Sequence, residues 1–229
     1  MTPGARDPEA AIAALLDEAI AAGVCSAAAA AIGAGPRAAR FVRGVTRTVP
    51  DRGAAITAAT RFDLASLTKP IATATVVQHL VARGLLDLAA PAARWLPALD
   101  RTITVGHLLG HASGLPPHVK LYERLWAGDL DGEADPRAAL VAMATRTPLD
   151  RAPGTAAVYS DLGFIALGAV CERAGDAPLE TLTAAALAPL ELAATGFVDL
   201  RGDAPRPDAP ATELCPRRGL VVGEVHDEN

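Results

Sequence analysis

The order of extended and helical patterns along the chain is the feature that most restricts its fold. Two short extended runs, residues 24–35 and 37–47, lie near the start, and a turn signal between them favours a β-hairpin. Helical patterns precede them at residues 8–22 and fill most of residues 71–190. Since strands and helices are grouped and do not alternate, the sequence predicts an α+β fold and not an alternating α/β fold.

Capping signals mark where the predicted helices begin and end. Asp7 and Pro8 suit the start of the first helix, and Gly23 suits its end. Gly84 likewise ends the helix predicted over residues 71–82. Further helices are expected within residues 85–97, 104–111, 121–130, 135–146, 160–175 and 179–190, and the segment 201–218, rich in proline, arginine and aspartate, is expected to be a loop.

Composition and charge exclude several classes of protein. The 229 residues are 51% hydrophobic and 21% charged, which is typical of a globular chain with a substantial core. The formal net charge is −5, so a nucleic-acid-binding surface would oppose the overall field, and we expect no nucleic-acid partner. No apolar run reaches the roughly 18 residues that span a bilayer, so we expect no membrane association.

Targeting and metal-binding signals are sparse. Residues 1–10 lack the basic and then apolar order of a signal peptide, and the three widely spaced cysteines match no metal pattern, which favours a cytoplasmic location. His107 and His111 stand four residues apart on a predicted helix, but no third ligand accompanies them. We therefore expect no metal and no cofactor. Instead, His111 is expected to hold a loop through hydrogen bonds, and His118 to lie on the surface.

Ser66 and Lys69 form the pattern most indicative of chemistry. If a helix begins at Ser66, the two side chains lie one turn apart on one face, and Pro70 suits the first turn of such a helix. A serine hydroxyl needs a base to become a strong nucleophile. A lysine can be that base once burial or a neighbouring positive charge lowers its pKa, whereas arginine cannot. Backbone N–H groups at a helix start also stabilise a nearby anion.

The rarity of these residue types favours a catalytic interpretation over a structural one. The chain has four serines and two lysines, so a Ser-x-x-Lys pattern is expected by chance only about 0.03 times. The alternative is that Ser66 caps a helix and Lys69 is solvated. Tyr159, one of two tyrosines, is either a core residue or a phenol that shuttles a proton beside the lysine ammonium. Beside Ser66 and Lys69, the second interpretation is preferred.

Three segments together resemble the serine hydrolase family that contains class C β-lactamases, D-alanyl-D-alanine carboxypeptidases and related esterases. The matching segments are FDLASLTKP (62–70) for the nucleophile, LLGHASGL (108–115) for the Leu-Leu-x-His-x-Ser-Gly-Leu stretch and PGTAAVYSDLGF (153–164) for the Tyr-x-Asn stretch. The resemblance implies a β-lactamase/transpeptidase-like α+β fold, with an antiparallel sheet flanked by helices and a helical domain. It also implies an acyl-enzyme mechanism, in which Ser66 is the nucleophile, Lys69 its hydrogen-bonded partner and Tyr159 the general base and acid.

Two departures from the family pattern change what we expect. Asp161 stands where the family has asparagine, and a carboxylate only accepts hydrogen bonds and repels an anionic β-lactam or peptide carboxylate. Ester hydrolysis is therefore favoured, and Asp161 can instead pair with Lys69. The family's [K/H]-x-G triplet is absent after Tyr159. We therefore expect a domain that lacks the C-terminal part of its sheet, and with it one oxyanion-hole donor.

These patterns predict one incomplete domain over residues 1–229. Residues 1–62 are expected to form the helix and hairpin of the sheet domain, residues 63–200 a mostly helical part with the nucleophile, and residues 201–229 a Pro-rich loop segment.

The expected function is hydrolysis of an ester, an amide or a β-lactam, with a small-molecule acyl substrate as the expected partner. Asp161 and Tyr122 are expected to bind this substrate, since Tyr122 and Trp126 stand four residues apart and can line a cleft wall. The alternative function is a non-catalytic binding module or an inactive fragment that lacks the third motif.

Overall fold

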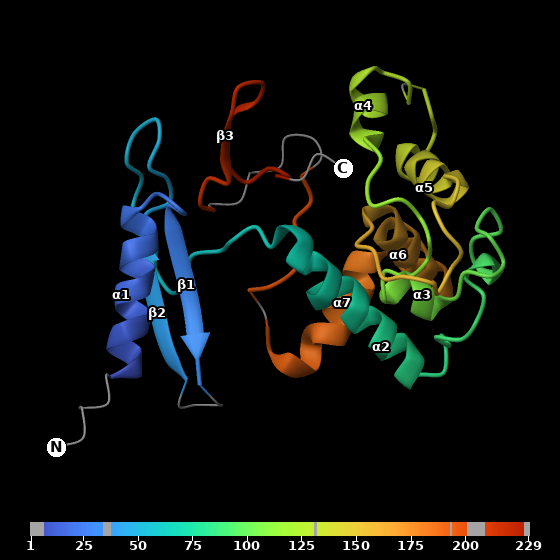
Figure 1. Ribbon diagram of the computed structural model, residues 1–229, viewed down its shortest axis with the longest axis horizontal. Coiled ribbons are helices and arrows are strands. Elements are labelled where there is room, and N and C mark those ends of the chain that lie inside the picture. Colours follow the sequence, from blue (N-terminus) through green and yellow to red (C-terminus); the bar gives the residue numbers. More distant parts are fainter. Residues whose placement is uncertain (1–6, 34–37, 131, 193, 201–208, 227–229) are drawn as a thin grey trace. The chain divides into compact units, whose positions relative to one another are not determined.

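The structure of the chain, a computed structural model, divides into two compact units (Figure 1). The sheet unit comprises Met1–Asp63 and Val198–His226, and the helical unit is built on Leu64–Phe197. The residues that the structure describes are 7–33, 38–130, 132–192, 194–200 and 209–226.

A helix and a hairpin begin the sheet unit, as predicted. Helix α1 (Pro8–Ala21) is capped by Asp7, whose carboxylate accepts a hydrogen bond of 3.0 Å from the Glu9 N–H. Strands β1 (Ala27–Ile32) and β2 (Ala39–Gly44) pair antiparallel, and α1 contacts both strands (Figure 1). The expected Gly35-Pro36 turn lies outside the described residues.

A second, short hairpin in the sheet unit corrects the prediction of a loop over residues 201–218. Strand β3 (Glu213–Cys215) pairs antiparallel with β4 (Gly219–Val221). Each strand has three residues, which is too short for an alternating pattern to stand out among prolines and arginines. The part of that segment at 201–208 lies outside the described residues.

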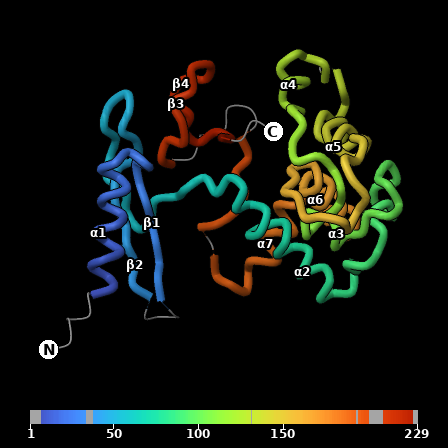
Figure 2. Tube along the Cα trace, in the orientation of Figure 1, coloured from blue at the N-terminus to red at the C-terminus, as the bar shows by residue number. Residues whose placement is uncertain are grey.

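The helical unit contains most of the predicted helices, with slightly shorter bounds. They are η4 (Ala92–Arg94), α3 (Val105–Leu109), α4 (Leu121–Trp126), α5 (Pro136–Arg146), α6 (Asp161–Gly175), α7 (Leu179–Leu187) and η5 (Ala188–Leu190). Figure 2 shows the path of the chain through them. None of the helices in the described part of the chain is long and apolar enough to cross a membrane.

The helix predicted over residues 71–82 has an irregular start that the sequence did not predict. The segment begins as a single 3₁₀ turn, η2 (Ala65–Leu67), continues as a π-helix, η3 (Lys69–Ala74), and becomes α-helical only in α2 (Thr75–Ala82). Pro70 has no N–H to donate, so a regular α-helical ladder cannot include it as a donor. The carbonyl of Pro70 instead accepts a hydrogen bond of 3.1 Å from the Thr75 hydroxyl. Such π-helical turns are frequent at functional sites.

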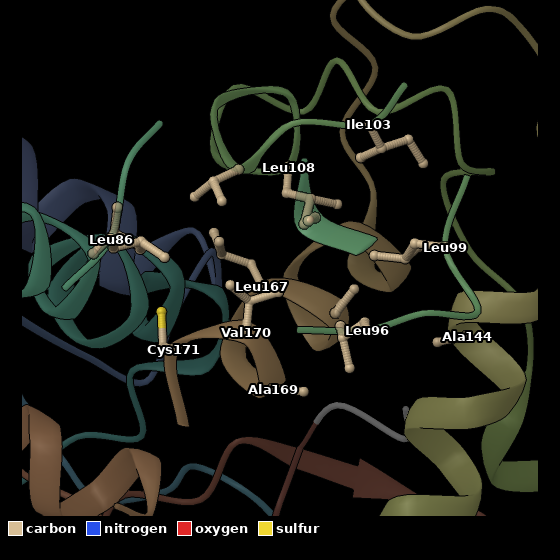
Figure 3. Packing of buried hydrophobic residues seen from close by; sticks show 14 of the residues in the cluster. Leu86, Leu96, Leu99, Ile103, Leu108, Ala144, Leu167, Ala169, Val170 and Cys171 are labelled. Atoms are coloured by element: carbon tan, nitrogen blue, oxygen red, sulfur yellow. The ribbon is translucent and has the colours of Figure 1, made fainter. Parts of the chain in front are cut away.

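Helix α6 is the centre of the helical unit. It contacts α2, α3, α5 and α7, and eight of its residues are buried. Figure 3 shows how its side chains pack among leucines and isoleucine from the neighbouring segments. The labelled members of this core include Leu96, Leu99, Ile103, Leu108, Leu167, Val170 and Cys171. Because α6 is held on several sides, the residues at its N-terminus are fixed relative to α3 and α2.

Gly114 is predicted to be essential to the stability of the helical unit. Its φ is +82°, and an added Cβ would lie 2.2 Å from the carbonyl oxygen of Arg151. Gly84 is a matched control, because its φ is +70° and nothing lies within 4 Å of an added Cβ. Gly84→Ala should cost only the backbone strain, about 1 kcal/mol. Gly114→Ala should lower the free energy of unfolding by about 3 kcal/mol or more.

Urea denaturation followed by tryptophan fluorescence measures this difference. Both tryptophans of the chain, Trp95 and Trp126, belong to the helical unit, so their signal reports on that unit. Equal losses of stability in Gly114→Ala and Gly84→Ala would contradict the close approach of Gly114 to Arg151.

Candidate active site

A cavity of about 530 Å³ lies within the helical unit. Most of its lining is apolar, and its polar lining side chains are Ser66, Lys69, His111 and Tyr159. The lining residues are Leu64, Ala65, Ser66, Leu67, Lys69, Pro70, Ala74, Leu109, His111, Tyr159 and Phe164. They come from all three segments that carry the family resemblance, so the fold brings these segments to one place.

Ser66 accepts two hydrogen bonds at this cavity. The Tyr159 hydroxyl donates to Ser66 Oγ over 2.8 Å, from 93 residues further along the chain. Lys69 Nζ donates to the same oxygen over 3.2 Å. The three side chains predicted to be catalytic are therefore in mutual contact, with the nucleophile candidate between the other two.

The backbone before Ser66 has an unusual conformation. Ala65 has a φ of +43°, in the left-handed region that a residue with a Cβ rarely adopts. Such strain persists only where the surrounding structure holds it, and it occurs often at functional sites. The turn places Ser66 at the exposed mouth of the cavity and Lys69 behind it, with a side chain that is 16% exposed.

Asp161 forms an ion pair with Lys69. Its Oδ1 lies 2.8 Å from Lys69 Nζ, and the two side chains are only 18% and 16% exposed. Burial tends to lower the pKa of Lys69 and is the largest single influence, but contacts with Asp161 and Tyr159 together outweigh it. The pKa of Lys69 is therefore raised, and Lys69 is an ammonium at neutral pH. These contacts favour a charged Lys69 over the lysine base with a lowered pKa that the sequence suggested.

The residues around Tyr159 are tied to the loop after α3 by backbone and side-chain hydrogen bonds. The Val158 N–H donates to the carbonyl oxygen of His111 over 2.8 Å, and the Ser160 N–H donates to His111 Nδ1 over 3.1 Å. The buried Ser160 hydroxyl donates to the Pro116 carbonyl over 2.6 Å and accepts from the Gly163 N–H at the start of α6 over 3.1 Å. Tyr159 is thus held between two anchored neighbours.

His111 holds a loop through hydrogen bonds, as the sequence suggested, and its ring also contacts Tyr159. Its ring lies 4.6 Å from the Tyr159 ring and 4.7 Å from the Phe164 ring, measured between centroids. Burial lowers the pKa of His111, and the charge of Lys69 lowers it further. The neutral imidazole is therefore favoured, and this form can accept the Ser160 N–H at Nδ1.

His107 and His111 make separate hydrogen bonds within the helical unit. His107 Nδ1 accepts a hydrogen bond of 3.3 Å from the Thr104 N–H, so it belongs to the cap of α3. Throughout the residues with a described position, no group of three or more potential metal ligands gathers.

Tyr122, predicted to bind substrate, lies elsewhere. It is on α4, where its ring is 4.4 Å from the Trp126 ring, and it is not among the residues that line the cavity. The spacing of four residues correctly indicated contact between the two rings. It did not indicate whether they line the cavity.

His118 is a site residue that the sequence did not reveal. It is exposed, as expected, yet its Nδ1 lies 3.3 Å from Asp161 Oδ2. Asp161 is 43 residues away along the chain, and no local pattern marks a contact over such a separation.

Comparisons with known proteins agree with this geometry. The Beta-lactamase family model matches residues 12–227. N-acetylmuramyl-L-alanine amidase of Bacillus subtilis (strain 168) is 33% identical over 192 residues, which cover 74% of this chain and 43% of the relative. Esterase EstB of Burkholderia gladioli is 41% identical over 157 residues, which cover 61% of this chain and 39% of the relative. The chain thus spans less than half the length of these curated relatives.

A solved structure confirms the predicted fold. The D-amino acid amidase from Ochrobactrum anthropi SV3, complexed with L-phenylalanine, is 26% identical with a TM-score of 0.63, and the match covers 79% of this chain and 51% of that one. The α+β, β-lactamase/transpeptidase-like fold expected from the three motifs is thereby confirmed. With a family model that matches residues 12–227, the chain belongs to the Beta-lactamase family.

Proposed function

We propose that this chain carries the nucleophile of a serine hydrolase that forms an acyl-enzyme on Ser66. The observation that carries the proposal is the position of Ser66 Oγ, within hydrogen-bonding distance of both Tyr159 and Lys69 at the mouth of an apolar cavity. A nucleophile, a proton acceptor and a fixed positive charge are the groups that acyl transfer to serine requires.

The reaction proceeds in two halves. Tyr159 first loses its hydroxyl proton to solvent and becomes a phenolate beside the Lys69 ammonium. Ser66 Oγ then attacks the carbonyl carbon of the substrate while its proton passes to the phenolate oxygen of Tyr159, 2.8 Å away. Tyr159 then returns the proton to the leaving group as the bond between the carbonyl carbon and that group breaks. In the second half, water loses a proton to Tyr159 and attacks the acyl carbon, and Ser66 regains its proton as it leaves.

Lys69 acts in this scheme as a charge and not as the base. Its raised pKa keeps it protonated, and an ammonium can donate hydrogen bonds but cannot accept a proton. Its contact of 3.2 Å with Ser66 Oγ and its position 5.0 Å from the Tyr159 ring centroid let it offset the negative charge that forms as Ser66 loses its proton. Asp161 holds the ammonium in this place.

The substrate class follows from the cavity and from Asp161. The apolar lining suits an acyl group without charge. Asp161 in place of asparagine adds a carboxylate near the reacting atoms, which opposes substrates with a carboxylate, such as β-lactams. We therefore favour ester or amide substrates, and relatives named as an esterase and an amidase support this choice.

Covalent labelling tests the proposal directly. Incubation with a fluorophosphonate probe should add the mass of the probe less HF to the intact chain, and incubation with a penicillin should add the mass of one penicillin, because Ser66 Oγ contacts both Tyr159 and Lys69. Ser66→Ala should abolish the adduct, whereas Ser26→Ala should not, since Ser26 is in the sheet unit. Intact-mass spectrometry measures the adduct.

The fate of the penicillin adduct separates two functions. Decay with release of product indicates a hydrolase, whereas a permanent adduct indicates a binding module that traps its ligand. A folded chain that forms no adduct with either reagent would contradict the proposal.

Removal of the Tyr159 hydroxyl should slow labelling. Tyr159→Phe deletes the proton acceptor while the ring contact with His111 remains, so the fluorophosphonate labelling rate should fall by about 10² to 10⁴. Tyr122→Phe is the matched control, because Tyr122 is the other tyrosine of the chain and lies outside the cavity. Equal labelling rates in Tyr159→Phe and Tyr122→Phe would show that Tyr159 is not the proton acceptor.

Asp161→Asn should shift the preference between substrates. Without the carboxylate, the turnover of nitrocefin, an anionic β-lactam, relative to a neutral ester should rise about three- to tenfold. Loss of Asp161 should also lower the pKa of Lys69, and this change affects both substrates alike. The ratio of nitrocefin turnover to ester turnover cancels that common effect. Asp176→Asn makes the same change of charge at the opposite end of α6 and should leave the ratio as it is. An unchanged ratio in Asp161→Asn would refute the repulsion.

A further inference from the structure

His118, Asp161, Lys69 and Ser66 form a continuous chain of polar contacts. His118 Nδ1 lies 3.3 Å from Asp161 Oδ2, the other carboxylate oxygen of Asp161 lies 2.8 Å from Lys69 Nζ, and Lys69 Nζ lies 3.2 Å from Ser66 Oγ. The two oxygens of Asp161 therefore face different groups. Oδ1 faces the Lys69 ammonium inside the site, and Oδ2 faces the His118 imidazole at its edge.

The backbone holds His118 and Asp161 together. The Asp161 N–H donates to the carbonyl oxygen of Pro117, the residue before His118, over 2.9 Å. Asp161 is also the first residue of the well-packed helix α6. The contact between the two side chains therefore does not depend only on the rotamer of an exposed histidine.

We propose that His118 is a specificity-determining residue of this site, which through Asp161 sets the net charge that a substrate meets beside Ser66. This inference rests on the proposed hydrolase function. When His118 is neutral, the charges of Lys69 and Asp161 cancel. When His118 is protonated, it also balances Asp161, and the positive charge of Lys69 is left in excess. The site then tolerates a substrate carboxylate better than it does when His118 is neutral.

Burial makes this change of charge effective near the nucleophile. The Lys69 and Asp161 side chains are 16% and 18% exposed, so water screens their interactions less than those of surface ions. The His118 side chain is 45% exposed and can exchange protons with the solvent. Histidine ordinarily changes its charge between roughly pH 5 and 8, within the range in which an enzyme is easily assayed.

The contribution of His118 to the pH dependence can be distinguished from that of other titratable groups nearby. Lys120, two residues along, pairs with Glu123 over 2.9 Å, and neither group ordinarily titrates near neutral pH. His111 is closer to Ser66 and also senses Lys69 and Asp161, but its lowered pKa favours the neutral form. A variant at His118 therefore distinguishes its contribution from that of His111.

The test compares two esters that differ in one charge. The substrates are p-nitrophenyl hexanoate and the mono-p-nitrophenyl ester of adipic acid, which have acyl chains of equal length and the same leaving group. The ratio of their kcat/KM values cancels the ionisation of Ser66, Tyr159 and Lys69, which both reactions share. It is measured from about pH 8.5 to about pH 5.5 in the wild type, His118→Gln and a control, His79→Gln.

The wild type should favour the adipate ester more as the pH falls, with a rise of about three- to tenfold in the ratio. His79→Gln should show the same rise, because His79 is ten residues beyond Lys69 along η3 and α2, on the order of 15 Å away. In His118→Gln the ratio should be independent of pH. Thermal melts check that both variants are folded, and His118→Asn replaces His118→Gln if the latter is not.

Each other outcome overturns the inference. A pH-independent ratio in the wild type, or an equal rise in His118→Gln, would show that His118 does not set the charge of the site, while hydrolysis itself would stand. Failure of the wild type to turn over either ester would overturn the proposed function and this inference with it.

Discussion

The hydrogen bonds that tie residues 158–161 to the loop after α3 are the constraint on which the rest of the site depends. Ser160 is at their centre, because its buried hydroxyl caps α6 and donates to the Pro116 carbonyl, while its N–H donates to His111. Tyr159 and Asp161 flank Ser160, so both are fixed at once. One packed helix terminus thereby positions Tyr159, the proposed proton acceptor, on one side and Asp161, the counter-ion of Lys69, on the other.

The electrostatics of the site follow from this arrangement. Burial alone would lower the pKa of Lys69. The contacts with Asp161 and Tyr159 outweigh burial, so the pKa is raised. Asp161 is thus one of the partners that favour the charged form of Lys69. In the proposed mechanism Lys69 stays a cation, and the proton of Ser66 passes to the phenolate oxygen of Tyr159. The same carboxylate connects the site to His118 at its edge.

Packing explains why the candidate site is held firmly and how it can include strained backbone. Helix α6 is buried against α2, α3, α5 and α7, and it supports Asp161 at its first residue. Two residues of the candidate site have left-handed backbone conformations: Ala65, which precedes Ser66, and His111, whose ring contacts that of Tyr159. Strain of this kind survives only if the surrounding core holds it, and the core cluster of the helical unit surrounds α6.

The sequence by itself determined the class of fold, most helix positions and the identity of the candidate nucleophile. Capping residues, apolar periodicity and the short motifs are local signals, and local signals suffice for α1, the first hairpin, α6 and the pairing of Ser66 with Lys69. The same signals missed the π-helical start at Lys69 and the three-residue strands β3 and β4, because these depend on proline geometry and on pairing between short segments. Only the tertiary structure decided that Asp161 faces Lys69 and His118 and that Tyr122 faces Trp126 and not the cavity. The physical reason is that a pKa, and with it a chemical role, depends on burial and on charges brought from distant parts of the chain, and no local pattern contains that information.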